Sequence, residues 1–298
     1  PEAHTFGADK VCRRWLSCSC LLIAWTERSC SRAAHARVTP MASRWAKAPP
    51  GSSFELYAQA MLDYWMGKRV RVEFERDDGY RSLSALHSYF STANQWPRME
   101  RVAMKEVRGR VLDLGCGPGR HTLYLQSKGH AVVGLDASPT QVALARIRGA
   151  HEVYLGNMRR IPRGLGTFDS VLLLGNNLGL AGDIPRTRAF LRDLKPTLRR
   201  GGRLIGHSRL PGTWSEDHLP YVRRNIARRR PPGLLTLRVR YKGRIGDWFE
   251  LLILSPEDLA RIAHQSGWEL TRVIWGGGYA PGDYIAILEP RSRIAHRI

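Results

Sequence analysis

Apolar and amphipathic stretches alternate regularly between residues 109 and 207. The short apolar runs are typical of buried strands, and the stretches between them carry apolar residues at helical spacing. We expect strands over Val111–Leu114, Ala131–Leu135, Val153–Leu155, Phe168–Leu174 and Arg203–His207. Helices are expected over Arg120–Ser127, Thr140–Arg148 and Pro185–Leu198. This alternation predicts an α/β fold, in which right-handed crossovers connect a parallel sheet covered by helices on both faces.

The pattern changes after the fifth of these strands. The β-rich runs Leu234–Tyr241 and Asp247–Leu254 are separated by a short glycine-containing segment, so they predict a hairpin. The runs Glu269–Trp275 and Tyr284–Leu288 are expected to close the sheet as an antiparallel pair. We therefore expect residues 211–254 to form a cap inserted into the main domain.

The segment before the first strand predicts helices over Phe54–Met66, Arg81–Ser91 and Pro97–Val107. We expect these helices, within residues 41–108, to cover an active site in a domain that spans 109–291, with 292–298 as a tail. Residues 1–40 differ in composition and include an apolar stretch broken by Ser and Cys, with no clean signal-peptidase site after it. We interpret them as an unstructured or non-native extension.

The chain is strongly basic, with 47 Lys and Arg residues against 26 Asp and Glu residues and a formal charge of +21. Such a charge raises the question of a polyanionic partner. Seven of these residues are lysines, and the arginines are scattered over the whole chain, which fits arginine-rich codon usage as well as it fits a nucleic-acid surface. The local exception is Arg223–Arg240. Its arginines are suited to an acidic small molecule or a phosphate backbone, and the alternative that we favour is a solvated charged helix ended by Pro231-Pro232.

The cysteine pattern bears on the cellular compartment. Four of the five cysteines lie in the first thirty residues, without CxxC spacing, which disfavours both a zinc site and a disulfide framework. No apolar run approaches the roughly 18 to 20 residues that a membrane-spanning helix needs. We expect a cytoplasmic protein with no bound metal and no membrane anchor.

The segment VLDLGCGPGR, residues 111–120, lies between a predicted strand and a predicted helix. Its glycines let the backbone pass close beneath a ligand, and the helix start offers unpaired N–H groups. A dinucleotide fingerprint counted from Gly115 would place its third glycine at 120, where Arg120 stands. Asp113 lies inside the strand, and its carboxylate suits a ligand with a positively charged group better than it suits a pyrophosphate. Asp136 ends the second strand, where a carboxylate can accept both hydroxyls of an adenosine ribose.

The run VLDLGCGPGRHTLYLQSKGHAVVGLDASPTQVALAR, continued by GNMRRIPRGLGTFDSVLLL and LKPTLRRGGRLIG, resembles class I S-adenosylmethionine (SAM)-dependent methyltransferases. The resemblance covers about Arg110–His207. It implies a Rossmann-like, seven-stranded, mostly parallel sheet whose last strand is antiparallel. It also implies that SAM is the cofactor and that the chain is a methyltransferase.

The resemblance further implies a cofactor site built from the glycine segment and from residues that end or follow the next strands. These residues are Asp113, Gly115, Cys116, Gly117, Gly119, Asp136, Ala137, Asn157, Met158 and Leu174. Asp113 would lie near the methionine amino group, Asp136 would bind the ribose, and Ala137 would pack on adenine. Asn157 stands where the family usually has Asp. Because an amide oxygen can also accept from the adenine amino group, we expect altered contact there and not loss of binding.

Methyl transfer from a sulfonium is an in-line displacement that needs alignment and exclusion of water, without a covalent enzyme intermediate. His207 and Asn176 are the candidate catalytic residues, since both follow predicted strands. His207 is either a base or acceptor-orienting residue, or a histidine hydrogen-bonded at a strand end. Asn176 is expected near the methyl group as an amide or backbone contact. Cys116 is interpreted as a small loop residue, since no base partner for a nucleophilic thiol can be placed.

The fourth strand ends in Leu174-Gly175-Asn176-Asn177, which differs from the Asn/Asp-Pro-Pro-aromatic motif that positions exocyclic amines of nucleic-acid bases. We therefore favour an enzyme that methylates a small-molecule acceptor. An RNA or protein methyltransferase that uses the basic surface is the alternative. A non-catalytic SAM-binding module is disfavoured, because it predicts erosion of the glycine segment or of Asp136, and both are intact.

Overall fold

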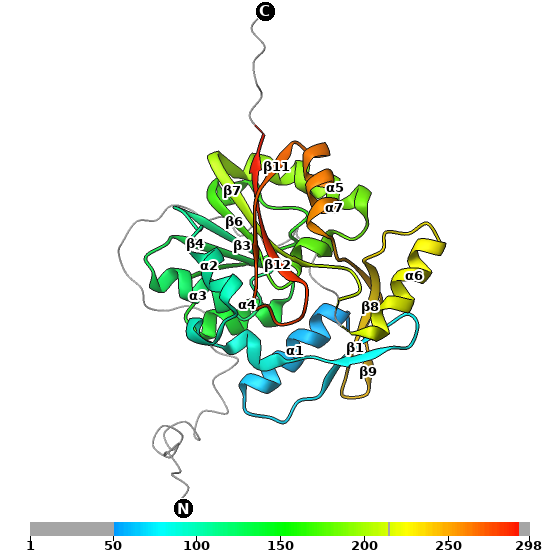
Figure 1. Cartoon of the computed structure of the whole chain (residues 1–298). Helices are drawn as coiled ribbons and strands as arrows, with labels where there is room; N and C mark the ends of the chain where they lie inside the picture. Colours follow the sequence, from blue (N-terminus) through cyan, green and yellow to red (C-terminus); the bar gives the residue numbers. More distant parts are fainter. Residues whose placement is uncertain (1–50, 214, 292–298) are drawn as a thin grey trace, which may run out of the picture. The chain divides into compact units, whose positions relative to one another are not determined.

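The computed structural model describes residues 51–213 and 215–291, which contain two sheets with helices packed on them (Figure 1). The helices are α1 (Ser53–Trp65), α2 (Arg98–Met104), α3 (Arg120–Ser127), α4 (Pro139–Ile147), α5 (Ile184–Leu194), α6 (Leu219–Ala227) and α7 (Pro256–Gln265). Short 3-10 helices are η1 (Leu86–Phe90), η2 (Ala93–Gln95), η3 (Arg163–Leu165), η4 (Asn177–Ala181), η5 (Lys195–Thr197) and η6 (Glu216–His218). The extension predicted over residues 1–40 and the tail over 292–298 lie outside the described residues.

The main sheet has seven strands in the order β11-β12-β7-β6-β3-β4-β5. Their bounds are β3 (Val111–Leu114), β4 (Val132–Asp136), β5 (Glu152–Leu155), β6 (Phe168–Leu173), β7 (Leu198–Arg209), β11 (Trp268–Trp275) and β12 (Asp283–Pro290). Neighbours from β5 to β7 are parallel, whereas β12 is antiparallel to both β7 and β11. The predicted α/β fold, with a mostly parallel sheet closed by antiparallel strands, is confirmed.

Helices cover both faces of this sheet, as β6 illustrates. Val171 and Leu173 belong to a buried cluster with side chains of α5 and α7, whereas Leu172 and Leu174 belong to a cluster with side chains of α2 and α3. Successive side chains of a strand point to opposite faces, so a strand covered on both sides is apolar throughout. This explains why residues 171–174 read as an uninterrupted apolar run.

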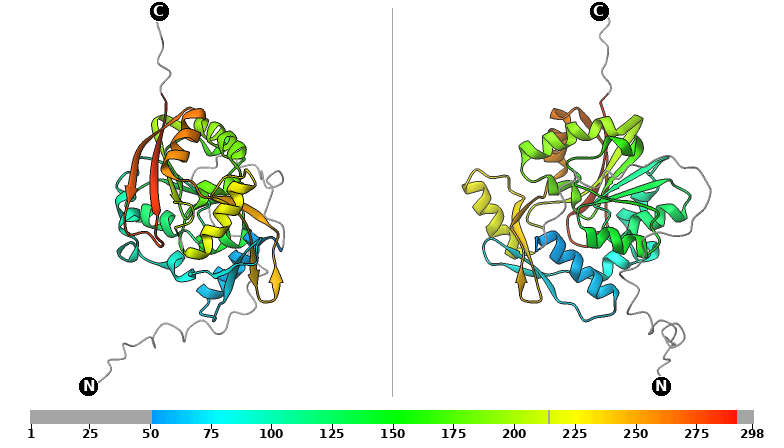
Figure 2. Two further views of the ribbon diagram at one scale, coloured as in Figure 1. Left: turned by 45° about the vertical axis from the view of Figure 1, so that its right-hand side comes forward. Right: turned by 180° about the vertical axis from the view of Figure 1, so that it is seen from behind.

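A second sheet is entirely antiparallel and has the order β10-β8-β1-β2, with β9 paired to β8. Its strands are β1 (Val72–Arg76), β2 (Arg81–Leu83), β8 (Leu234–Tyr241), β9 (Arg244–Ile245) and β10 (Phe249–Leu252). Val239 and Tyr241 of β8 pack with Leu56 and Met61 of α1 and with Leu144 of α4. Both views of Figure 2 show this sheet beside α1 and α6. The predicted hairpin after residue 234 is therefore confirmed, and it pairs with a segment before residue 109.

The helix predicted over Arg81–Ser91 is wrong. Residues Arg81–Leu83 form β2 and pair with β1, and only Leu86–Phe90 are helical, as one 3-10 segment. The apolar spacing of this segment fits a helix, but a tight turn around Asp78 and Gly79 joins β1 to β2 and commits the chain to a hairpin. Asp-Gly between two strand-forming runs is a strong hairpin signal, and it outweighed the helical period.

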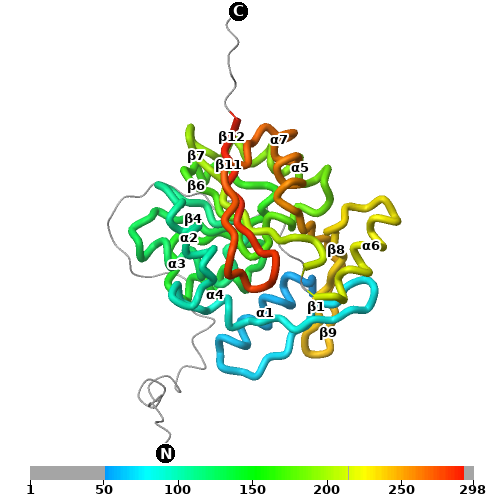
Figure 3. The backbone as a smooth tube through the Cα atoms, viewed as in Figure 1, coloured from blue at the N-terminus to red at the C-terminus, as the bar shows by residue number. Residues whose placement is uncertain are grey.

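The loop between β11 and β12, residues 276–282, lies at the edge of the main sheet where the parallel strands have their carboxyl ends. Figure 3 traces it as a continuous turn. Asp283, which follows the loop, pairs with Arg209 at the end of β7. Ligands of open α/β sheets bind at this edge. Within the described part of the chain, no helix is long and apolar enough to cross a membrane.

Candidate functional site

The glycine loop, residues 115–119, connects β3 to α3 in left-handed backbone conformations. Gly115, Gly117 and Gly119 have φ angles of 71°, 55° and 82°. A Cβ atom on Gly115 would lie 2.4 Å from the Nδ2 atom of Asn177, whereas a Cβ on Gly117 would meet no described atom within 4 Å. Glycine is thus required by backbone conformation at all three positions. At Gly117 it also leaves space above the loop that a ligand could fill.

Asp136 ends β4 directly beside this loop. Its Oδ2 accepts a hydrogen bond from the Gly117 N–H at 2.9 Å, and its Oδ1 accepts from the Ser138 N–H at 2.9 Å. Burial, reinforced by the charges of Asp113 and Glu55, raises the pKa of Asp136 to about 6, although the two N–H groups act in the opposite direction. The side chain is therefore an anion above that pH, fixed against the loop by two backbone donors.

Glu55, at the start of α1, contacts the segment that follows Asp136. It accepts hydrogen bonds from the Ser138 hydroxyl at 2.6 Å and from the Thr140 hydroxyl. These contacts place the start of α1 at the rim of the site. Sequence reasoning missed Glu55, because its partners lie more than eighty residues away and no local pattern connects them.

The other predicted cofactor residues lie at the same edge of the sheet or directly beneath it. Asp113 is 2% exposed and accepts from the Thr122 hydroxyl at 2.7 Å, and burial raises its pKa. Asn157 follows β5 and accepts from the Arg159 N–H at 2.9 Å, which shapes the turn after that strand. Ala137 and Met158 are half-buried, and Leu174 is buried at the end of β6.

Cys116 points into the protein instead of toward the site. It is buried in a cluster with Val142, Ala145 and Val153. Burial, followed by the nearby carboxylates of Asp136 and Asp113, raises the pKa of its thiol well above the usual value. A thiol that stays protonated is a poor nucleophile, which agrees with its interpretation as a small loop residue.

The structure brings His207 and Asn176 together. The Asn176 N–H donates to His207 Nδ1 at 3.2 Å, and His207 Nε2 lies 3.6 Å from Asp283 Oδ1. His207 is 3% exposed. Asp283 also accepts from the Arg209 guanidinium and from the Ala280 N–H. Burial raises the pKa of Asp283, but the hydrogen bond with His207 and the charge of Arg209 outweigh it and lower that pKa. Both His207 nitrogens therefore face groups of the protein itself.

Asn176 has an uncommon backbone conformation for a residue other than glycine, with φ at 67°. Its Oδ1 atom is buried and has no hydrogen-bond partner among the described residues. The next residue, Asn177, donates to the backbone oxygens of Leu114 and Gly115 at 3.0 and 2.9 Å. The turn after β6 is thus attached both to the glycine loop and, through His207, to β7.

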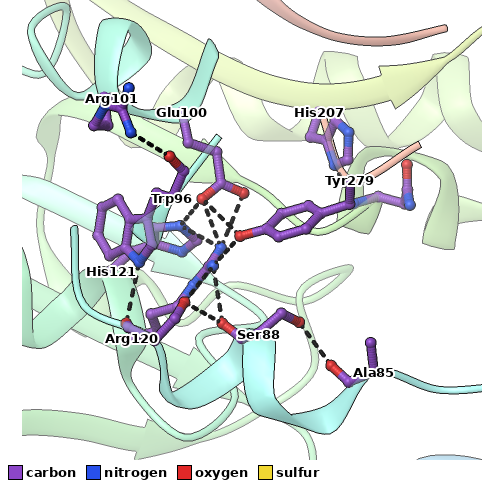
Figure 4. Close-up of polar contacts among 11 residues, drawn as sticks. Ala85, Ser88, Trp96, Glu100, Arg101, Arg120, His121, His207 and Tyr279 are labelled. Atoms are coloured by element: carbon purple, nitrogen blue, oxygen red, sulfur yellow. Dashed lines mark hydrogen bonds and ion pairs between the residues drawn. The ribbon is translucent and has the colours of Figure 1, made fainter. Parts of the chain in front are cut away.

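Arg120, the first residue of α3, joins several segments around the site (Figure 4). Its Nη2 atom donates to the two carboxylate oxygens of Glu100 at 2.9 and 2.8 Å. Its Nη1 atom donates to the Ser88 carbonyl at 3.0 Å and to the Tyr279 hydroxyl. The guanidinium lies 5.0 Å from the centre of the Trp96 ring. Sequence analysis noted Arg120 only as a departure from a dinucleotide motif and missed the cluster.

The model of a methyltransferase domain family matches residues 111–202. The 18S rRNA (guanine-N(7))-methyltransferase of Bos taurus is 38% identical over 104 residues, which cover 32% of this chain and 37% of that protein. The malonyl-[acyl-carrier protein] O-methyltransferase of Salmonella typhimurium is 38% identical over 95 residues, which cover 31% and 36%. The chain thus spans less than two-fifths of the length of these curated relatives.

A solved structure extends the likeness beyond that segment. The SAM-dependent methyltransferase from Bacteroides fragilis, in complex with S-adenosyl-L-homocysteine, is 26% identical and superposes with a TM-score of 0.69. The match covers 83% of this chain and 98% of the other. The fold and the glycine loop with its neighbouring Asp136 carboxylate are those expected of such a methyltransferase. The family model and these relatives indicate the same family. The chain thus contains a methyltransferase domain of the class I SAM-dependent family.

Proposed function

We propose that this protein is an enzyme that binds SAM and transfers its methyl group to a small-molecule acceptor. The observation that carries the proposal is the arrangement of Asp136 and Gly117. An anionic carboxylate is fixed beside a loop whose surface at Gly117 is open. A carboxylate at the end of the second strand is suited to accept the two hydroxyls of an adenosine ribose, and the glycine allows close approach of the ligand.

The residues around this arrangement fit SAM. Asp136 would bind the ribose, and the loop from Gly115 to Gly119 would lie beneath the ribose and the methionine part. Asp113 would act near the amino group, with Leu174 beside the site. Ala137, Asn157 and Met158 would contact adenine. Met158 supplies an apolar contact and the Asn157 amide a polar one, as a heteroaromatic base requires. When bound, SAM supplies a sulfonium methyl group that is already activated for in-line displacement.

The chain itself has to align the acceptor and exclude water. The start of α1 covers the rim of the site through Glu55, and the β11–β12 loop reaches Arg120 through Tyr279. No covalent enzyme intermediate is needed, which agrees with the inert environment of Cys116. These elements come from opposite ends of the chain and lie outside the matched methyltransferase domain. Together they border the proposed site.

RNA is the alternative acceptor, since the Bos taurus relative is named as an rRNA methyltransferase. That likeness covers 32% of the chain, and the O-methyltransferase of Salmonella typhimurium is equally identical over a stretch of similar length, so the likeness does not favour one acceptor. In the basic stretch, Arg224 pairs with Asp77, and both Arg238 and Arg240 pair with Glu75. These three arginines are less available to phosphates, which supports the small-molecule proposal, whereas Arg223, Arg228 and Arg229 of the same stretch are exposed. A cytoplasmic location stays a prediction.

We expect the purified chain to bind SAM in calorimetry and to transfer a radiolabelled methyl group to the low-molecular-mass fraction of a metabolite extract. In a parallel reaction, total RNA should stay unlabelled. Label in RNA, with binding that weakens steeply as salt is raised, would support the alternative, because phosphate contacts release counterions. Failure to bind SAM would remove the proposed function altogether.

We also propose that His207 positions Asn176 and does not act as a base. His207→Asn should keep an acceptor near the Asn176 N–H and retain most activity, with an unchanged pH profile of kcat. His207→Ala should leave that N–H without its acceptor and lower stability by about 1–3 kcal/mol. The measurements are thermal unfolding and the kcat profile with the acceptor that labelling identifies. If both variants lose activity equally and the pH profile of kcat loses its acidic limb, His207 is instead assigned to proton transfer.

A further inference from the structure

A pocket opens between the end of α1, the η1–η2 segment and the β11–β12 loop. Its volume is about 470 Å³, and Tyr64, His87, Phe90, Ser91 and Tyr279 are among its lining residues. Pockets that hold small molecules typically measure about 300–1,000 Å³. The volume is therefore suited to a molecule of one or two rings.

Aromatic rings from three separate segments line this pocket. Tyr64 lies in the last turn of α1, Phe90 ends η1, and Tyr279 lies in the β11–β12 loop. The centres of the Tyr64 and Phe90 rings are 5.5 Å apart, and the rings are tilted by 31°. Tyr64 and Tyr279 remain 37% and 47% exposed. Exposed ring faces at this spacing favour a planar aromatic ligand, which can stack on them or meet their edges.

The polar groups of the pocket come from hydroxyl, imidazole and amide side chains, and the Arg120 guanidinium contacts two of these residues. The described lining residues contribute hydroxyl, imidazole and amide groups and no carboxylate. Arg120 donates to the Ser91 hydroxyl at 3.4 Å and to the Tyr279 hydroxyl. Burial and the charge of Glu100 raise the pKa of Tyr279, so its hydroxyl stays protonated, and it donates to Glu100 Oε2 at 3.4 Å. This surface suits hydroxyl or carboxylate substituents, and it offers nothing to neutralise an ammonium group.

Two arginines, Arg120 and Arg148, connect the pocket wall to the glycine loop. Arg120 directly follows Gly119 and holds both Ser88 and Tyr279. On the other side, the Arg148 guanidinium lies 4.9 Å from the centre of the Phe90 ring and donates to the Pro118 carbonyl. These two arginines therefore link the pocket to the loop proposed to lie beneath SAM, near which an acceptor has to approach the methyl group.

We propose that this pocket is the acceptor site and that it takes a planar aromatic molecule bearing hydroxyl or carboxylate groups. The inference rests on the proposed function and adds the class of substrate to it. Tyr279 and Phe90 set the specificity, because their rings line the pocket from two separate segments and both are linked to the glycine loop through an arginine.

The test is calorimetry on the full chain saturated with S-adenosylhomocysteine, with 4-hydroxybenzoate, phenol and tyramine as probes. These probes share one ring and differ in charge. We expect 4-hydroxybenzoate to bind in the millimolar range or tighter, phenol to bind similarly or more weakly, and tyramine to bind most weakly. Tyr279→Leu and Phe90→Leu should each weaken 4-hydroxybenzoate by about ten-fold, the effect of losing one ring contact.

The matched control is Tyr154→Leu, which removes another exposed tyrosine, on β5. It should leave probe binding unchanged, and all three variants should bind S-adenosylhomocysteine like the parent chain. Unchanged probe affinity in both pocket variants, preference for tyramine, or no probe binding by a chain that binds S-adenosylhomocysteine would each overturn the inference. A chain that does not bind S-adenosylhomocysteine would show that the proposed function itself is wrong.

Discussion

Asp136→Ala is expected to weaken SAM binding at least about a hundred-fold. The carboxylate holds the Gly117 and Ser138 N–H groups, each at 2.9 Å, and is proposed to accept the ribose hydroxyls. Hydrogen bonds to a charged group contribute about 1.5–3 kcal/mol each, and about 1.4 kcal/mol corresponds to ten-fold in affinity. Losing two such bonds to the ligand therefore weakens SAM binding about a hundred-fold or more. Titration calorimetry with SAM measures it.

The control for this prediction is Asp193→Ala, which removes an exposed carboxylate from α5. Its SAM affinity should match that of the parent chain. Gly117→Val provides a second variant at the site, since a β-branched residue is strained at a φ of 55° and its side chain would occupy the open space above the loop. Unchanged affinity in both Asp136→Ala and Gly117→Val would contradict the assignment of the cofactor site.

The same carboxylate predicts how SAM binding depends on pH. Burial raises the pKa of Asp136 to about 6, so the group is protonated in a growing fraction of molecules as the pH falls below that value. A protonated carboxyl group is a weaker acceptor for ribose hydroxyls. SAM affinity should therefore rise as the pH increases through about 6 and level off above it, and this step should be absent in Asp136→Ala.

Glu100→Ala is expected to lower the free energy of unfolding by about 3–5 kcal/mol, the usual cost of leaving a buried charge without its partner. Glu100 is 2% exposed and contacts Arg120 at 2.8 Å, and only 9% of the Arg120 side chain is exposed. For a chain of this size, the loss corresponds to a decrease of about 10 °C in Tm. Thermal and denaturant unfolding measure it.

Two comparisons make this prediction specific. Glu269→Ala removes an exposed carboxylate that lies 3.9 Å from Arg291, and it should change stability little. The double variant Glu100→Met with Arg120→Met should recover much of the stability lost by Glu100→Ala, because no charge is then left buried. If Glu100→Ala is no less stable than Glu269→Ala, the Arg120 cluster does not stabilise the fold.

The pH dependence of this contribution has a definite sign. Burial raises the pKa of Glu100, but hydrogen bonding to His121 and the charges of His121 and Arg120 outweigh it and lower that pKa from 4.5 to about 2. A carboxyl group with a lower pKa in the folded state stabilises the fold above its unfolded pKa. Its contribution should therefore be complete above about pH 4.5 and decrease as the pH falls toward 2.

The sequence predicted the main sheet well and the second sheet incompletely. Strands β3 to β6 and the later part of β7 were visible because each contains a short apolar run between helical stretches, whereas residues 198–202 of β7 were not predicted as strand. The β8–β10 hairpin was also visible, but its partner strands β1 and β2 were not. Asp78-Gly79 was the available signal for that hairpin, and the helical spacing after Arg81 obscured it. The antiparallel pairing of β1 with β8 joins segments more than 150 residues apart, which no local pattern records.

The sequence by itself determined the strand–loop–helix unit around Gly117 and the carboxylate at Asp136, because backbone conformation and periodicity are local properties. Only the tertiary structure decided what surrounds that unit. Glu55 reaches Ser138, His207 faces Asp283, and Arg120 meets Glu100 and Tyr279 through closure of distant segments. These contacts depend on burial and on pairing of charges between distant segments, so no local pattern in the sequence predicts them.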